Sequence, residues 1–139
     1  MKHLGEVLKT SPSNVEQAAE LVESIAVVAD CMACCNACAD ACMGEEQVGR
    51  LRDCVRRLLD CAGVCSVAVA ALCRPHGGER EHIAALLEAC ESACRSCATE
   101  CEKHAQRHEH CRACGESCRE CEETCGELIA ALEGGRIRA

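Results

Sequence analysis

The sequence predicts an all-α protein, an antiparallel up-down-up-down four-helix bundle with a cysteine-lined core. Strong helix-breaking residues fall at only three internal places and leave four long segments of helical composition. Cysteine recurs at steps of three and four within these segments, which is the a/d spacing of a buried helix seam. The chain has 139 residues, 18 of them cysteine and none aromatic, so one domain must build its core from Ala, Leu, Val, Ile and Cys.

The breakers set the expected helix bounds. In the first segment Ser11 is expected as the N-cap and Pro12 as the first helical residue. Gly44 to Glu46 forms a tight connection, and Pro75 to Gly78 is the clearest break in the chain. We expect one domain over residues 1–139, with helices at about 12–43, 47–74, 79–105 and 109–133, and flexible ends at 1–10 and 134–139. Helix lengths alone leave open a dimer of αα-hairpins.

The cysteines fall on one stripe of each helix, the stripe that faces the bundle axis. Cys34 lies beside its stripe, and Cys73 is turned about 80° from Cys65 by helical periodicity. The stripes comprise Cys31, Cys34, Cys35, Cys38 and Cys42; Cys54, Cys61, Cys65 and Cys73; Cys90, Cys94, Cys97 and Cys101; and Cys111, Cys114, Cys118, Cys121 and Cys125.

This thiol-lined interior favours a soft metal ion. Packing alone is a poor explanation, because leucine would bury more apolar surface. Disulfides between cysteines four apart would strain a helix, and zinc and iron–sulfur sites usually take cysteines from turns and loops. Thiolates select Cu(I), and bridging thiolates would let capacity approach one copper per cysteine. Many equivalent sites indicate storage and no enzymatic activity.

One end of the predicted bundle carries weaker copper ligands. There we expect a polar mouth for capture and transfer, formed by Met43, His104, His108 and His110 beside the last cysteines, although His108 and His110 also fit a solvated loop. At the other end the stripes become apolar. This expected floor comprises Val27, Val28, Leu72, Ile83, Leu86, Leu87, Leu128, Ile129 and Leu132.

Other classes of partner fit poorly. A net charge of -8 and the lack of aromatic rings disfavour nucleic acid. No apolar run reaches the roughly 18–20 residues of a membrane span, and the first residues lack a signal's apolar core, so we expect a cytoplasmic protein. The alternatives are a zinc or cadmium thiolate sink and, less favoured, a thiol redox protein using a pair such as Cys94 and Cys97. The sequence identifies no copper donor or acceptor protein.

A resemblance supports this reading. The run Cys97-Ala-Thr-Glu-Cys101-Glu-Lys-His104, continued by His108-Glu-His110-Cys111-Arg-Ala-Cys114 and then Cys118, Cys121 and Cys125, resembles the bacterial copper storage proteins. The resemblance covers about residues 30 to 126. It implies a four-helix bundle filled with Cu(I), a homotetramer of bundles and the cytosolic branch of the family. The chain departs from the pattern where Ser24 and Val28 occupy the in-line positions before Cys31.

Overall fold

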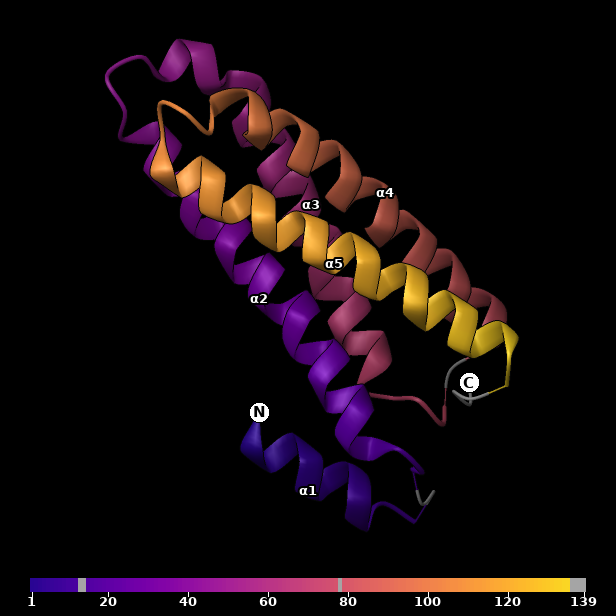
Figure 1. The fold of residues 1–139 in the computed structure, drawn as a ribbon. Coiled ribbons are helices and arrows are strands. Elements are labelled where there is room, and N and C mark those ends of the chain that lie inside the picture. The colour runs from indigo at the N-terminus through magenta and orange to yellow at the C-terminus, as the bar shows by residue number, and fades with distance from the viewer. Residues whose placement is uncertain (13–14, 78, 136–139) are drawn as a thin grey trace.

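The structure, a computed structural model, describes residues 1–12, 15–77 and 79–135, and every regular element in these residues is a helix (Figure 1). The prediction of an all-α fold is confirmed. A short amino-terminal helix precedes four long ones. The elements are α1 (Lys2–Thr10), α2 (Ala18–Met43), the 3-10 helix η1 (Val48–Leu51), α3 (Arg52–Leu72), α4 (Arg80–His104) and α5 (Glu109–Glu133).

The four long helices pack in a closed ring. α2 contacts α3 and α5, and α4 contacts the same two helices on the other side (Figure 1). The thiol contacts give the direction of neighbouring helices. Cys31 meets Cys118, whereas Cys42, further along α2, meets Cys111, which lies earlier on α5. α2 and α5 are therefore antiparallel, and the contacts between α3 and α4 follow the same reversed order.

The amino end differs from the sequence expectation. Lys2–Thr10, within the stretch expected to be flexible, form α1, because Leu4 and Leu8 lie one turn apart and pack against the core. α2 begins at Ala18, later than the expected start near residue 12. Ser11 is the C-cap of α1, with extended backbone angles of φ -61° and ψ 138°. Pro12 disfavours helical angles at the residue before it, so it ends the first helix and does not begin the second.

The other helix ends lie close to their expected places. η1 replaces the first turn of the second predicted helix, and α3 ends at Leu72, just before Pro75. α5 ends at Glu133, and Gly135 adopts a φ of 73°, a left-handed angle that favours glycine and stops the helix. Gly78, the last residue of the predicted Pro75 to Gly78 break, lies outside the described residues, as does most of the expected flexible carboxyl end, 136–139.

The core has a thiol region and an apolar end. Val28, Leu72, Ile83, Leu87, Leu128 and Leu132 of the expected floor are buried, and Val27, Leu86 and Ile129 are half-buried. Leu21 and Ile25 extend this apolar end along α2. Leu58 interrupts the thiol stripe of α3 and is fully buried, so the thiol region also contains a leucine.

α2 is long and apolar enough to cross a membrane by length and composition, which the sequence analysis did not expect. Its 26 residues include an 18-residue window with a mean hydropathy of 1.6. Core helices of bundles pass the same test, and α2 carries five of the cysteines on or beside its inward face. Because only 33% of that window is buried inside the bundle, the inward face accounts for part of its hydropathy and exposed apolar residues account for the rest.

Candidate metal centre

The thiols converge on the bundle axis. All the cysteines are free, and all except Cys34 and Cys73 are buried. Polar residues such as Arg95, Arg112 and Glu120 occupy exposed positions between the cysteines, so the cysteine stripe is the face that turns inward, as the three-and-four spacing predicts. Neighbouring sulfurs lie close enough to share a metal ion: the Sγ atoms of Cys61 and Cys94, and those of Cys65 and Cys90, are 3.7 Å apart.

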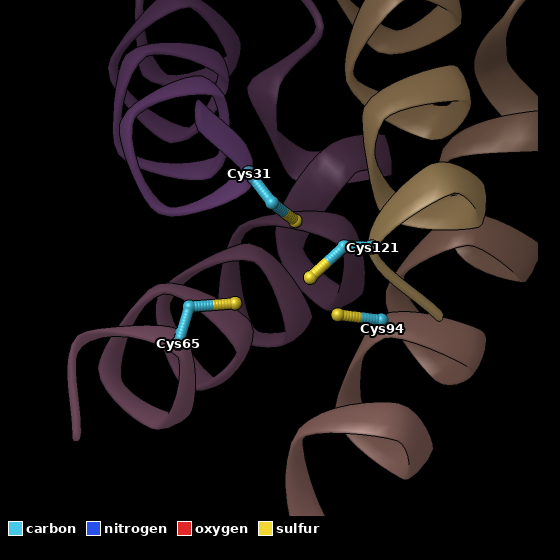
Figure 2. A group of neighbouring side chains, drawn as sticks. All are labelled: Cys31, Cys65, Cys94 and Cys121. Carbon is cyan, nitrogen blue, oxygen red and sulfur yellow. The ribbon is translucent and has the colours of Figure 1, made fainter. Parts of the chain in front are cut away.

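Figure 2 shows one such group, in which each long helix contributes a single cysteine. The sulfurs of Cys31 (α2), Cys65 (α3), Cys94 (α4) and Cys121 (α5) all point toward one another, and all four lie within 4.8 Å of each other. Four convergent thiols from four helices could hold a metal ion, whose binding would release their protons.

Adjacent groups share sulfurs. Cys31 also belongs to a second four-thiol group with Cys35, Cys61 and Cys118, where the Cys35 and Cys118 sulfurs are 3.7 Å apart. Cys121 likewise belongs to a third group, with Cys90 and Cys125. The shared cysteines therefore join three groups into a continuous lattice of thiols.

A fourth group lies where α2 ends and α5 begins, and it mixes sulfur with nitrogen. The His110 Nδ1 atom lies 3.4 Å from the sulfur of Cys38, 3.6 Å from that of Cys111 and 4.0 Å from that of Cys42. We call this set of three thiols and one imidazole the mouth group. The other ring nitrogen of His110, Nε2, lies 3.2 Å from the Glu45 Oε1 atom.

The remaining mouth residues lie further from the thiols. The His108 Nδ1 atom is 3.4 Å from the same Glu45 oxygen, and its ring centroid is 5.3 Å from that of His110. His104 is half-buried at the end of α4. Hydrogen bonds from Cys101 and Cys111 lower the pKa of the Cys54 thiol, and the nearby His104 adds a smaller effect in the same direction. Met43 is 55% exposed. The structure thus brings His110 into a thiol group, with His108 beside it.

Six cysteines belong to none of these groups, and some of them contact another thiol. The Cys54 and Cys101 sulfurs are 3.9 Å apart, and that of Cys114 lies 3.8 Å from that of Cys35. Cys97 is fully buried next to Cys101 in the α4 stripe. The two half-buried cysteines belong to none of the groups found among the described residues: Cys34 on the flank of α2 and Cys73 at the C-cap of α3.

Most of the chain matches a known protein family. The profile of a family described as "Copper storage protein" matches residues 17–130. The chain belongs to the copper storage protein family. A search of curated proteins found no significant match.

Several solved structures are similar over most of the chain. The copper storage protein Ccsp from Streptomyces lividans, loaded with 10 copper equivalents, is 40% identical and superposes with a TM-score of 0.86. That match covers 91% of this chain and 98% of the other. A second structure, described as a cytosolic copper storage protein from the same organism with five coppers, is 44% identical with a TM-score of 0.77, covering 79% of this chain and 92% of the other. A histidine-to-alanine variant of Ccsp is 42% identical, with a TM-score of 0.80 and coverages of 85% and 98%.

Protonation differs within the mouth group of this copper storage family member. Hydrogen bonds from Cys101 and Cys111, with a contribution from His110, lower the pKa of Cys38 to about 7. Burial raises the pKa of Cys42 to about 12. The mouth therefore holds one thiol that ionises near neutral pH, while its neighbour must release a proton when a metal binds.

Glu45 is a candidate site residue that the sequence pattern did not predict. Its carboxylate joins His108 and His110 in a three-residue group that could hold a metal ion. The sequence feature that could have pointed to Glu45 is its position just after the helix that carries Cys42, at the same end of the bundle as the two histidines. Acidic residues are so common in helix connections that this position alone gave no reason to select it.

Proposed function

We propose that this chain stores copper as Cu(I), many ions per molecule, bound by thiolates inside the bundle. The sharing of Cys31 and Cys121 between neighbouring groups carries the proposal. Separate four-thiol cages would suit one zinc ion each. A shared sulfur instead bridges two ions of low coordination number, which thiolate-bound Cu(I) accepts. A continuous lattice of bridging sulfurs therefore fits a copper store better than a row of zinc sites.

One experiment separates copper storage from the zinc or cadmium sink. The reduced protein is titrated anaerobically with Cu(I) and, separately, with Zn(II), each against a competing chelator. We expect Cu(I) to saturate near one ion per cysteine, about 18 per chain. Zinc bound through four unshared thiolates would stop at about four ions per chain. Tight zinc binding with copper saturation at that same low number would contradict the proposal.

A thiol redox role is disfavoured by burial. The Cys-x-x-Cys pair Cys94 and Cys97 would need an exposed, low-pKa thiolate to attack a partner's disulfide. Both residues are fully buried. We therefore propose a non-enzymatic role, and a cytosolic location in line with the description of the Streptomyces protein.

We also propose that the bundles assemble into a homotetramer, as the family resemblance implies. The outward side of α2 supports assembly, because small apolar residues such as Ala33 and Ala37 are exposed on a helix of high mean hydropathy. Light scattering of the reduced protein tests this point. A mass of four chains is expected, and a double variant Ala33→Glu and Ala37→Glu should lower it. A parent mass of one chain would contradict the assembly.

His104, His108, His110 and Met43 are proposed as ligands that pass copper between solvent and the lattice. Imidazole and thioether bind Cu(I) less tightly than thiolate does, so ions held there exchange more readily. The thiols Cys34 and Cys73 are proposed to add capacity at the edges of the lattice. No donor or acceptor protein is proposed.

A further inference from the structure

The His110 ring lies between two different chemical environments. Its Nδ1 atom faces the sulfurs of Cys38, Cys42 and Cys111, and its Nε2 atom faces the Glu45 carboxylate at 3.2 Å. A neutral imidazole carries one proton, so one ring nitrogen donates and the other accepts. Only the nitrogen without the proton can bind a metal ion. The partner of Nε2 therefore decides whether Nδ1 is free to act as a ligand.

Glu45 is well placed to make that decision. An ionised carboxylate only accepts hydrogen bonds, so a contact between Glu45 and Nε2 requires the proton to be on Nε2. The lone pair of Nδ1 then points at the three thiols of the mouth group. Histidines that bind metals almost always donate their other N–H group to such an acceptor, which fixes both the tautomer and the ring orientation.

The backbone of Glu45 is tied to the helix that carries two of these thiols. The Glu45 N–H group donates to the Cys42 carbonyl at 3.2 Å, and the Gly44 N–H group donates to the Asp40 and Ala41 carbonyls. The carboxylate thus stays in register with the last turns of α2. Because His110 belongs to α5, the contact sets an imidazole on one helix against thiols on another.

We propose that Glu45 is a positioning residue that holds the His110 Nδ1 atom toward Cys38, Cys42 and Cys111, so that the mouth group offers copper a nitrogen ligand beside three sulfurs. The same carboxylate oxygen contacts the His108 Nδ1 atom at 3.4 Å and restrains the neighbouring ring. This inference rests on the proposed copper storage. It adds that the affinity of the mouth group depends on a residue that binds no metal itself.

Two substitutions at Glu45 and one matched control test the role. Glu45→Ala removes the acceptor. Glu45→Gln removes the charge but keeps an oxygen that accepts the Nε2–H bond. Glu46→Ala alters the adjacent acidic residue, which is exposed. The total Cu(I) capacity of each protein is measured first, and a parent that binds only a few ions would contradict copper storage itself, whatever the variants do.

The decisive measurements are ¹⁵N NMR of the His110 ring and the release of the weakest-held copper to a chelator. In the parent and in Glu46→Ala we expect the Nε2–H tautomer and a copper-induced shift at Nδ1. Glu45→Ala should lose the single tautomer and hold its weakest-bound copper about 10–100-fold less tightly, the usual effect of removing such a partner. Glu45→Gln should stay close to the parent.

Three results would overturn the proposal. The first is a Glu45→Ala protein with the tautomer and release of the parent. The second is a Glu45→Gln protein as impaired as Glu45→Ala, since charge and not the hydrogen bond would then matter. The third is a copper-induced shift at Nε2, which would make Glu45, His108 and His110 a ligand set of their own.

Discussion

Replacing Cys31 by alanine is expected to remove more copper sites than one cysteine's share. Cys31 belongs to two four-thiol groups at once, with Cys35 lying 4.0 Å away in one of them and Cys121 in the other. Cys34, three residues further along the same helix, belongs to none of the groups. Cys34→Ala is therefore a matched control on the same helix.

The expected difference follows from the connectivity of the sulfurs. A thiolate that bridges two copper ions can bridge one ion in each of the two groups it belongs to, so its removal leaves about two ions without a second ligand. The expected loss for Cys31→Ala is therefore about two ions. Cys34→Ala should lose about one ion. The apo-protein should still fold, because removing one buried sulfur costs only about 1 kcal/mol.

Native mass spectrometry of each protein after saturation with Cu(I) and passage over a desalting column counts the retained ions. Circular dichroism of the metal-free proteins checks that both variants keep the parent's helix content. The reasoning would be refuted by equal losses in Cys31→Ala and Cys34→Ala, because equal losses mean that each thiol acts independently. A loss of about one whole zinc-like site per variant would refute it as well.

Three further outcomes are expected. Replacing Met43, His104 and His108 together by alanine should slow copper transfer to a chelator, while total capacity stays within about one or two ions of the parent because these ligands are weaker than thiolate. Stopped-flow measurements give the transfer rate. An unchanged rate would place the access route elsewhere. Burial lowers the pKa of His110, but its hydrogen bonds to Cys38 and Glu45 outweigh this, so the net shift is upward. The protonated form of His110 stabilises the apo-protein below about pH 6.5, and this contribution is lost as the pH rises through the raised pKa. Copper binding at the mouth should change in the opposite direction: it should weaken as the pH falls, beginning above about pH 6.5. Copper titrations at several pH values would detect this. Leu58→Ala should lower the unfolding free energy of the metal-free protein by about 3 kcal/mol in urea denaturation, because Leu58 is fully buried, and a fall below about 1 kcal/mol would mean that the thiol region repacks freely.

The sequence predicted which residues face inward, because helical periodicity fixes the face of each side chain. It did not predict which cysteines meet. The grouping of Cys31 with Cys65, Cys94 and Cys121 depends on how far each helix slides along its neighbours. That register is set by the connections and by the packing of side chains such as Leu58, neither of which has a periodic signal.

The amino end shows a second limit of sequence reasoning. Pro12 favours both the first turn of a helix and the end of a preceding one, so local chemistry alone left two interpretations. Tertiary contacts decided between them. Leu8 is 4% exposed, and burying it gives a nine-residue helix the stability that its own backbone bonds could not supply.

The two ends of the core differ in composition because metal binding and the stability of the metal-free protein require different side chains. Thiols bury less apolar surface than leucine, so a core made only of cysteine would hold copper at the cost of stability before loading. The apolar end formed by residues such as Ile25, Leu72 and Leu132 provides that missing burial, and each of these three is at most 2% exposed. It can do so only where no metal has to pass. On the copper-storage proposal, the polar mouth lies at the opposite end, where His110 would exchange its contact with Cys38 for a copper ion without opening the packed part of the bundle.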